Sequence, residues 1–244
     1  MTDSSNTHYA GQDLEALADL PRYTGWILEQ FQDELRGHVI EVGAGIGNVA
    51  IRYVDRVESL LLVEPAANLC EKLRIRTVGL KNVVIAEALL HDVAPELVAK
   101  PFDAALMVNV LEHIPDDVAV LTRLYEVLKP GGALCIFVPA VPEIYGSLDA
   151  IVDHVRRYRR AELQGKLEQA GFVVKRLSYL DTLGIVPWVV AGKILKRKKY
   201  DALGAQAYDR VGVPVTRALE AALNRVLPRT PIGKSLVAVA VKPG

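Results

Sequence analysis

Hydrophobic positions along the chain alternate between short apolar runs and longer stretches with helical spacing. The apolar runs end in glycine, acidic or turn residues, which is typical of buried strands. In chain order these runs cover residues 39–42, 59–63, 83–85, 102–108, 133–138, 172–177 and 235–241. Between them, helical spacing covers residues 66–76, 116–128 and 160–170, and the stretch after the first run is compatible with a helix through Arg56.

This order predicts an α/β fold in which a doubly wound, Rossmann-like, mostly parallel sheet carries helices on both faces. The last apolar run follows about 55 residues without a strand pattern. We therefore expect a single domain over residues 1–244, with an N-terminal helical cap at 1–36 and a helical insertion at 181–233. Within that insertion, an amphipathic helix is predicted for residues 215–227.

Composition limits the classes of protein that fit this pattern. Hydrophobic residues make up 51% of the 244 positions and charged residues 24%, so we expect a packed core and exclude a disordered chain. The two cysteines, Cys70 and Cys135, lie far apart and form no CxxC pair, which excludes disulfide scaffolds, zinc fingers and iron–sulfur clusters. We predict no metal site. A cytoplasmic setting is expected, because the polar, acidic start is unlike a signal peptide and no run of about 20 uncharged apolar residues occurs.

Charge is distributed unevenly, although the net charge is zero. Residues 1–128 carry 10 Lys and Arg against 20 Asp and Glu, whereas residues 129–244 carry 19 against 9. The basic second half indicates an anionic substrate or surface as its partner, or a solvated basic face.

A glycine-rich turn follows the first predicted strand. It reads Glu41-Val-Gly43-Ala-Gly45-Ile-Gly47-Asn48, and its glycines allow a ligand to approach backbone amides closely. The dinucleotide fingerprint would need glycine at position 48, where Asn48 stands. Glu41 places a carboxylate beside the turn, which opposes a pyrophosphate and suits a sulfonium or ammonium ligand. Both features argue against an NAD-dependent oxidoreductase.

Acidic residues also follow the next two predicted strands. Glu64 lies 17 residues after Gly47, close to the spacing of about 20 expected for an acid that binds ribose hydroxyls. Glu87 follows the third strand, where an adenine amino group would find it as an acceptor. Turn geometry or solvation explains each feature alone, but their joint order favours a nucleotide-like ligand.

Together with Asn109-Val-Leu-Glu-His113 after the fourth strand and Leu128-Lys-Pro-Gly-Gly132 before the fifth, these motifs resemble those of the class I S-adenosylmethionine-dependent methyltransferases. The resemblance covers roughly residues 36–180 and the last strand. It implies S-adenosyl-L-methionine as the cofactor and a seven-stranded sheet whose last strand is antiparallel, between strands five and six. The family usually joins strands six and seven by a short hairpin. We therefore expect the insertion to contact the substrate or a membrane.

The resemblance also implies the residues that hold this cofactor. The glycine turn with Glu41 would hold the methionine moiety, and Glu64 the ribose. Glu87 and Ala88 would contact the adenine, while Asn109 would lie at the edge nearest the transferred methyl group. The implied set is Glu41, Gly43, Ala44, Gly45, Gly47, Glu64, Pro65, Glu87, Ala88, Asn109 and Val110.

Two residues are candidates for handling a proton. Methyl transfer from a sulfonium depends mainly on alignment and exclusion of water, but a hydroxyl acceptor benefits from a base. His113 is the best placed imidazole, and Tyr158 is the second catalytic candidate. Packing of the loop is an alternative role for His113. Glu112 would either orient the imidazole or face solvent.

A second polar cluster follows the fifth predicted strand. It contains Tyr145-Gly-Ser-Leu-Asp149 and His154-Val-Arg-Arg157-Tyr158, which resembles the His-x-Arg-Arg-Tyr stretch of a bacterial methyltransferase branch linked with cell-surface polysaccharides and lipid-linked sugars. Arginine binds phosphates and carboxylates in a bidentate manner, although a charged approach to the next helix also explains the arginines. With one residue of the insertion, the predicted substrate-binding set is Tyr145, His154, Arg157 and Trp188.

The insertion allows two interpretations. An apolar stretch around Trp188 is followed by Lys196-Arg-Lys-Lys199. It would form either a lid over the substrate or, through residues 183–199, a peripheral contact with an anionic membrane surface.

These patterns predict a methyltransferase that acts by in-line displacement on a small-molecule or glycan or lipid-linked acceptor of anionic character. The alternative is a non-catalytic module that binds S-adenosylmethionine or a membrane surface. Nucleic acid is not expected as a partner, because Asn109-Val-Leu-Glu stands in place of Asp/Asn-Pro-Pro-Tyr/Phe and aromatic residues make up only 6% of the chain. A protein acceptor stays open, and the oligomeric state is not predicted.

Overall fold

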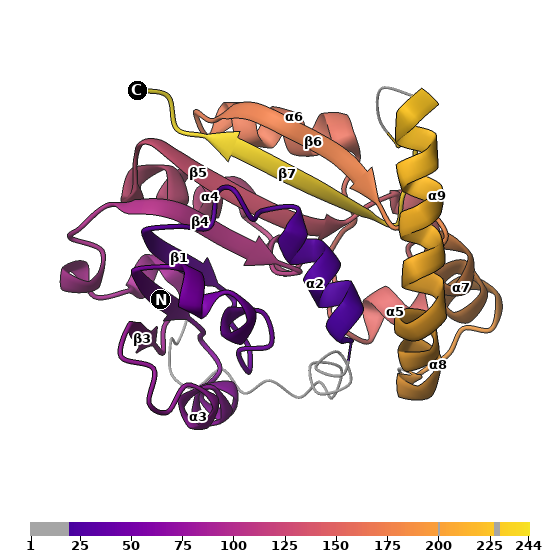
Figure 1. Ribbon diagram of the computed structural model, residues 1–244, viewed down its shortest axis with the longest axis horizontal. Coiled ribbons are helices and arrows are strands. Elements are labelled where there is room, and N and C mark those ends of the chain that lie inside the picture. The colour runs from indigo at the N-terminus through magenta and orange to yellow at the C-terminus, as the bar shows by residue number, and fades with distance from the viewer. Residues whose placement is uncertain (1–19, 200, 227–229) are drawn as a thin grey trace.

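A seven-stranded sheet with the order β3-β2-β1-β4-β5-β7-β6 forms the centre of the molecule (Figure 1). The computed structural model describes residues 20–199, 201–226 and 230–244. The strands are β1 (His38–Val42), β2 (Ser59–Val63), β3 (Val83–Ala86), β4 (Phe102–Val108), β5 (Leu128–Pro139), β6 (Val173–Leu180) and β7 (Ser235–Val241). β1 to β5 pair in parallel, and β7 is antiparallel to both β5 and β6. The expected Rossmann-like sheet with an antiparallel last strand is therefore confirmed.

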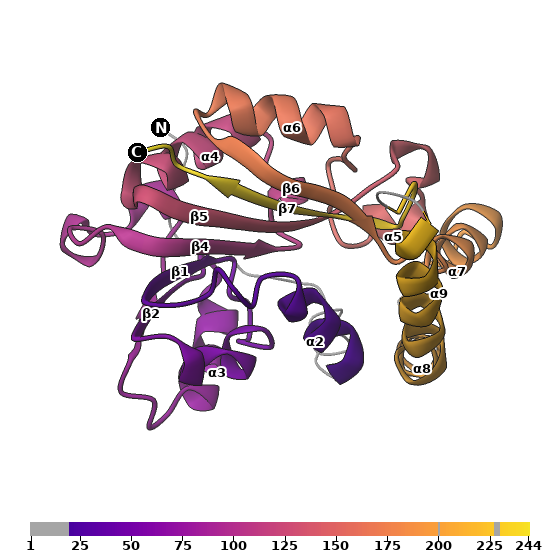
Figure 2. The same cartoon turned by 45° about the horizontal axis from the view of Figure 1, so that its top comes forward.

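Helices cover both faces of this sheet (Figure 2). Because successive side chains of a strand point to opposite faces, Ile40 joins the core cluster under one layer of helices and Val39 joins the cluster under the other. The first layer contains α4 (Asp117–Val127) and α6 (Arg160–Gln169), and the second contains α2 (Pro21–Glu29) and α3 (Ala67–Arg76).

The helix predicted through Arg56 is wrong. Two short 3-10 turns, Ala50–Arg52 and Val54–Arg56, follow the glycine turn instead. This stretch is rich in β-branched residues, which lose side-chain freedom in an α-helix. The predicted end of the helix over residues 116–128 is also wrong. Leu128 does not end that helix but begins β5, where it pairs with Phe102.

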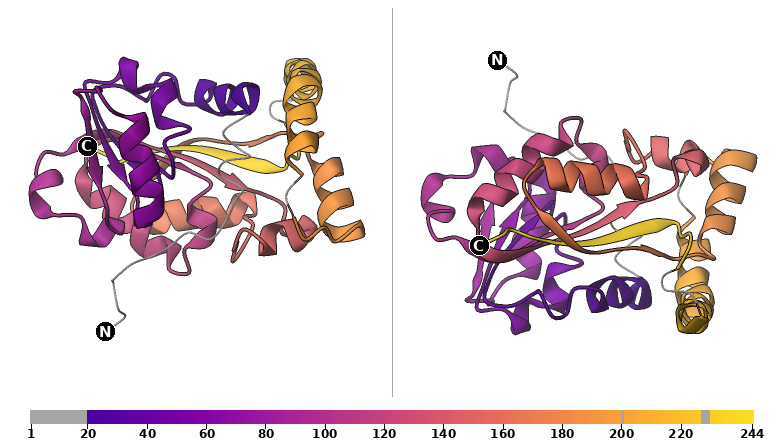
Figure 3. Two further views of the ribbon diagram at one scale, coloured as in Figure 1. Left: turned by 90° about the horizontal axis from the view of Figure 1, so that it is seen from below. Right: turned by 90° about the horizontal axis from the view of Figure 1, so that it is seen from above.

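Further helices lie beyond the end of the sheet toward which β1 and β4 run (Figure 3). They are α5 (Ser147–Ala150), α7 (Ile185–Val189), α8 (Ala202–Ala207) and α9 (Val213–Val226), and π-helical turns extend α7 over Val190–Ile194 and join α8 to α9 over Tyr208–Gly212. Position 227, the expected end of the amphipathic helix, lies outside the described residues, as does the 1–19 part of the predicted N-terminal cap. In the described parts of the chain, no helix combines the length and the apolar character that crossing a membrane requires.

The segment between β6 and β7 is fastened to the N-terminal helix α2. The Asp209 carboxylate accepts hydrogen bonds from the backbone amides of Tyr23 (2.7 Å) and Arg22 (3.4 Å), in the first turn of α2. No side chain of α2 itself caps that turn. A residue remote in sequence therefore supplies the acceptor that helix amides require.

We expect Asp209→Ala to lower the free energy of unfolding by about 1 kcal/mol, since the first amides of α2 lose their acceptor. Chemical denaturation followed by circular dichroism measures this change. Asp33→Ala, which removes an exposed carboxylate, is the control. Equal stability of the two variants would contradict the capping role.

Candidate functional site

The glycine turn begins directly after β1. Gly43, Gly45 and Gly47 have φ angles of +73°, +55° and +82°, in the left-handed region that favours glycine. A Cβ atom on Gly43 would lie 2.3 Å from Cγ2 of Val110, which follows β4. Backbone conformation and lack of space thus both require glycine at position 43.

Glu64, at the end of β2, is tied to this turn. Its buried carboxylate accepts hydrogen bonds from the amides of Gly45 (2.8 Å) and Ala66 (3.0 Å), one on each oxygen. Burial raises the pKa of Glu64, and the two amide bonds oppose that rise. Since a carboxylate offers about four lone-pair positions, this group retains acceptor capacity for hydroxyl donors.

Glu41 lies at the base of the same turn and is buried in the interior of the protein. Burial raises its pKa to about 8, although the hydroxyl of Tyr53 donates a hydrogen bond to it at 2.7 Å. Glu41 therefore holds a proton at neutral pH in the described structure. Sequence reasoning missed Tyr53, which lies between two 3-10 turns in a stretch for which a helix was expected.

The other residues implied for the cofactor surround this turn. The amide of Ala88 donates to the carbonyl of Glu64 at 3.2 Å, which joins the ends of β2 and β3. Asn109 adopts a left-handed φ of +53°, and its amide donates to the carbonyl of Phe137 at 2.9 Å. Ala44 is buried, Gly47 donates to its carbonyl, and Pro65 is half-buried beside Glu64.

Glu87 differs from the other implied residues in its orientation. Its carboxylate is partly exposed and forms an ion pair of 2.7 Å with Arg74 on α3. The structure thus brings the glycine turn, Glu64, Ala88 and Val110 together, while the Glu87 side chain turns toward the neighbouring helix.

On the acceptor side, a buried carboxylate connects the predicted substrate residues. Oδ1 of Asp149 accepts hydrogen bonds from Nδ1 of His154 (3.0 Å) and Nε of Arg157 (2.7 Å). Oδ2 accepts from the indole of Trp188 (3.2 Å) and the amide of Gly146 (3.0 Å). Burial alone would raise the pKa of Asp149, but the bonds from His154 and Arg157 hold it below its usual value.

Arg157 and Tyr145 complete this network. The buried guanidinium of Arg157 stacks 4.8 Å from the ring centre of Trp188 and donates to the carbonyl of Ala140 at 2.8 Å. The hydroxyl of Tyr145 donates to the carbonyl of His154 at 2.7 Å. All four predicted substrate residues are therefore linked directly or through Asp149, and Trp188 faces this network with its indole nitrogen.

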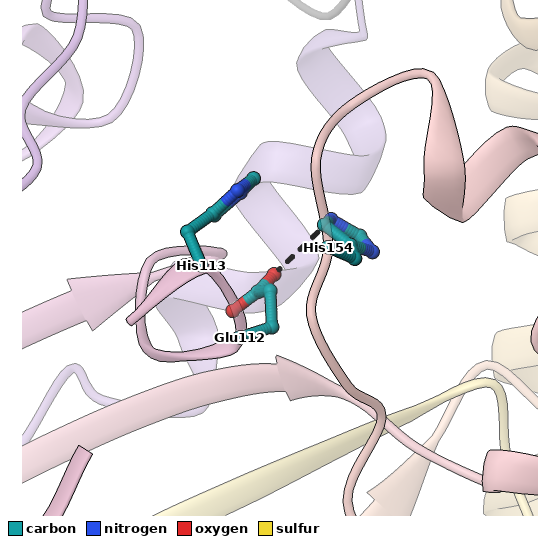
Figure 4. Close-up of side chains that lie close together, drawn as sticks. All are labelled: Glu112, His113 and His154. Atoms are coloured by element: carbon teal, nitrogen blue, oxygen red, sulfur yellow. Dashed lines mark ion pairs between the residues drawn. The ribbon is translucent and has the colours of Figure 1, made fainter. Parts of the chain in front are cut away.

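Two histidines and a glutamate meet beside the network (Figure 4). Glu112 and His113 belong to the 3-10 turn Leu111–His113 after β4, and His154 lies on the loop after α5. The two imidazole centres are 4.9 Å apart, and Nε2 of His154 is 3.6 Å from Oε1 of Glu112. Glu112 is fully buried, and burial raises its pKa to about 8. Glu112 was expected either to orient the imidazole or to face solvent, and its burial shows that the second expectation is wrong.

Tyr158 lies in a different environment from His113. Its hydroxyl is buried and donates toward the Asp117 carboxylate (2.8 Å) and the carbonyl of Leu111 (3.1 Å). Burial, followed by the Asp117 carboxylate, raises the pKa of Tyr158 far above its usual value. A hydroxyl held in this way packs the core, and this geometry favours His113 over Tyr158 as the group that takes a proton.

A cavity of about 280 Å³ lies under the segment between β6 and β7. Apolar side chains form much of its wall, and Trp188 is shared between the cavity and the Asp149 network. Arg197, Lys199 and Lys234 add positive charge, and Asp201, which forms an ion pair with Arg197, adds a negative charge. Lys234 forms an ion pair of 2.7 Å with Asp181 and lies over the rings of Tyr23, Trp188 and Tyr208. No motif in the sequence distinguishes Lys234, because Asp181 and the three rings that it contacts come from earlier segments of the chain. Asp149 belongs to the predicted polar cluster, but its bond with Trp188 joins it to a segment 39 residues away.

Known proteins share this architecture and these sequence patterns. The family model described as a methyltransferase domain matches residues 11–177. The tRNA 5-carboxymethoxyuridine methyltransferase of Escherichia coli K12 is 31% identical over 101 residues, which are 40% of this chain and 38% of that protein. A Mycolicibacterium smegmatis protein named "Probable S-adenosylmethionine-dependent methyltransferase" is 27% identical over 151 residues, 60% of this chain and 54% of that protein. The chain thus spans less than two thirds of the length of these curated relatives.

A solved structure shows the same fold at low sequence identity. The N-methyltransferase NodS of Bradyrhizobium japonicum, in complex with S-adenosyl-L-homocysteine, has a TM-score of 0.61 and 13% identity, with 96% of this chain and 94% of that chain covered. The left-handed glycine turn, the acceptor capacity of Glu64 and the buried acid Glu41 fit an adenosyl sulfonium ligand. The chain therefore belongs to the methyltransferase domain family, within the class I S-adenosylmethionine-dependent methyltransferases, and its cofactor is S-adenosyl-L-methionine.

Proposed function

We propose that this chain methylates an anionic, lipid-linked acceptor, such as a lipid-linked sugar, at a hydroxyl group. The observation that carries this proposal is the cavity beside the Asp149 network. Its wall joins apolar side chains to Arg197, Lys199 and Lys234, which outnumber the one carboxylate of the wall, Asp201. Trp188 connects the cavity to the histidine pair through Asp149. An amphipathic molecule with a negative group matches such a wall, because apolar surface and charge are both complemented.

The cofactor would be held at the carboxyl edge of β1 to β4. Glu41 and the glycine turn would hold the methionine end, and Glu64 would accept from the ribose hydroxyls. S-adenosyl-L-methionine supplies an electrophilic methyl group, whose bonding electron pair returns to sulfur as the acceptor oxygen forms the new bond. The remaining work of the protein is alignment of the acceptor and exclusion of water.

His113 is the residue that we assign to the proton of the acceptor hydroxyl. It follows β4 and Asn109, at the edge where the family resemblance implies the transferred methyl group, and its ring packs against that of His154. An imidazole accepts a proton near neutral pH, which assists a hydroxyl nucleophile. The Asp149 network then holds the acceptor-side loop in place around it.

The outer surface of α7 and its π-helical extension supports a membrane location for the acceptor. Val186 and Ile194 are 62% and 67% exposed. Val190, spaced four residues from each, is 40% exposed and also borders the cavity. The basic run 196–199 follows directly. Trp188 points inward to Asp149, so one segment provides both a lid toward the site and an apolar ridge beside positive charge toward solvent. This combination favours peripheral binding to anionic lipid.

The acceptor class is tested with S-adenosyl-L-methionine that carries a radioactive methyl group. Bacterial lipid extract, total tRNA and water-soluble polysaccharide are offered in parallel, because one relative is named for a tRNA substrate. We expect label in the lipid extract, and His113→Ala should reduce its rate about 100-fold while S-adenosylhomocysteine still binds. His91→Ala, at an exposed histidine, is the control. Label confined to tRNA or polysaccharide would refute the proposed acceptor, and an unchanged rate for His113→Ala would remove the assigned base.

The cofactor site is tested at Gly43. We expect Gly43→Ala to weaken binding of S-adenosylhomocysteine at least about tenfold in a calorimetric titration, because the new methyl group would clash with Val110. Gly79→Ala is a matched control, since Gly79 has a φ of +86° but nothing within 4 Å of the added carbon. Equal affinities of the two variants would place the cofactor elsewhere.

The membrane contact is tested at Ile194. We expect Ile194→Glu to reduce co-sedimentation with phosphatidylglycerol vesicles about tenfold, because it places charge in the apolar ridge. Val78→Glu, at a valine that is 81% exposed on another part of the surface, is the control. Equal sedimentation of both variants, or equal binding to phosphatidylcholine vesicles, would contradict an electrostatic membrane contact through this ridge.

A further inference from the structure

Glu112 is a buried carboxylate that the protein does not satisfy with hydrogen bonds. Among the described residues, three buried side-chain oxygens lack a hydrogen-bond partner, and two of them belong to Glu112. The third belongs to Asp181, and Lys234 is ion-paired with it. Buried polar atoms nearly always have partners, so the two oxygens of Glu112 require an explanation.

The atoms nearest to this carboxylate are of the kind that bind metal ions. Glu112, His113 and His154 each offer one ligand atom, and these three atoms lie within 4.8 Å of one another (Figure 4). The pair from separate segments, Nε2 of His154 and Oε1 of Glu112, is 3.6 Å apart. Around a tetrahedral zinc ion, with bonds of about 2.0 to 2.2 Å, ligand atoms lie about 3.4 Å apart. Small side-chain rotations would therefore bring the three atoms to one ion.

Asp149 prepares His154 for this role. Because an ionised carboxylate only accepts hydrogen bonds, its contact with Nδ1 places the imidazole proton there and leaves the lone pair on Nε2, the nitrogen nearer to Glu112. A histidine that donates its other ring nitrogen to a carboxylate is the usual arrangement of a metal ligand. Arg157 forms an ion pair of 2.7 Å with Asp149, so the charge of Asp149 is already balanced.

We propose that Glu112, His113 and His154 form a binding site for a divalent transition-metal ion, with Zn²⁺ as the ion that best fits two imidazoles and one carboxylate. Three protein ligands leave a fourth position open. This proposal rests on the proposed function for its role: an acceptor oxygen would fill that position, and the ion would favour loss of its proton to solvent. In the metal-loaded protein His113 would be a ligand, and the ion would replace its imidazole as the group that promotes proton loss. The ligands come from two separate segments, which is why the sequence analysis predicted no metal.

The site is tested by metal binding to the full chain, independently of turnover. After treatment with a chelator, the protein is titrated with Zn²⁺ by calorimetry and with Co²⁺ by visible absorption. We expect one ion per chain and Co²⁺ bands in the visible region. Glu112→Gln and His154→Asn should each weaken Zn²⁺ binding at least about tenfold, and Asp149→Asn about 10- to 100-fold. His91→Asn, which removes an exposed histidine beside Asp92, should leave the affinity for Zn²⁺ unchanged.

Binding of S-adenosylhomocysteine is measured on every variant as a check of folding. If one variant loses the fold, the other two still decide the question. Absence of Zn²⁺ binding to the unmodified chain, or Zn²⁺ affinity unchanged in the folded variants, would overturn the metal site. The proposed function would still stand in that case if S-adenosylhomocysteine binds and the lipid extract is labelled. Zn²⁺ binding without lipid labelling would instead support the metal site and refute the proposed lipid-linked acceptor.

Discussion

The acceptor side of this protein depends on one buried carboxylate, that of Asp149. It accepts hydrogen bonds from the loop after α5, through His154 and Arg157, and from α7, through Trp188. Removing one partner of a buried ion pair typically costs about 3 to 5 kcal/mol, because the other charge stays desolvated. The position of α7 and the orientation of His154 are therefore linked through the same carboxylate.

The cofactor side depends on a different constraint, the common edge at which parallel strands end. The residues after β1, β2, β3 and β4 must meet there, and the structure shows this for the glycine turn, Ala88 and Val110. Such meeting points can be predicted from the sequence, since they require only the positions of the strands. The apolar runs located β2, β4 and β7 with the same bounds that the structure has. Family resemblance then supplied the antiparallel direction of β7.

The rest of the site was not predictable because it consists of contacts between remote segments. Tyr53, between two 3-10 turns, donates a hydrogen bond to Glu41 from a stretch for which a helix was expected. Asp209 caps a helix that lies more than 180 positions earlier in the chain. The burial of Glu112 likewise follows from packing beside the loop of His154. The local sequence does not indicate whether an acidic residue after a strand is buried. Hydrophobic periodicity reports which side of an element is buried, but not which polar groups meet there.

The buried acid beneath the glycine turn has a consequence for ligand binding. Burial raises the pKa of Glu41 to about 8, which favours its protonated form near neutral pH. A cationic ligand that pairs with this carboxylate would have to displace the proton, which lowers its apparent affinity. That loss becomes smaller as the pH rises toward 8, so affinity increases over the same interval. A ligand bound in this way would exchange one positive charge for another, so the charge at the turn would be balanced both with and without it.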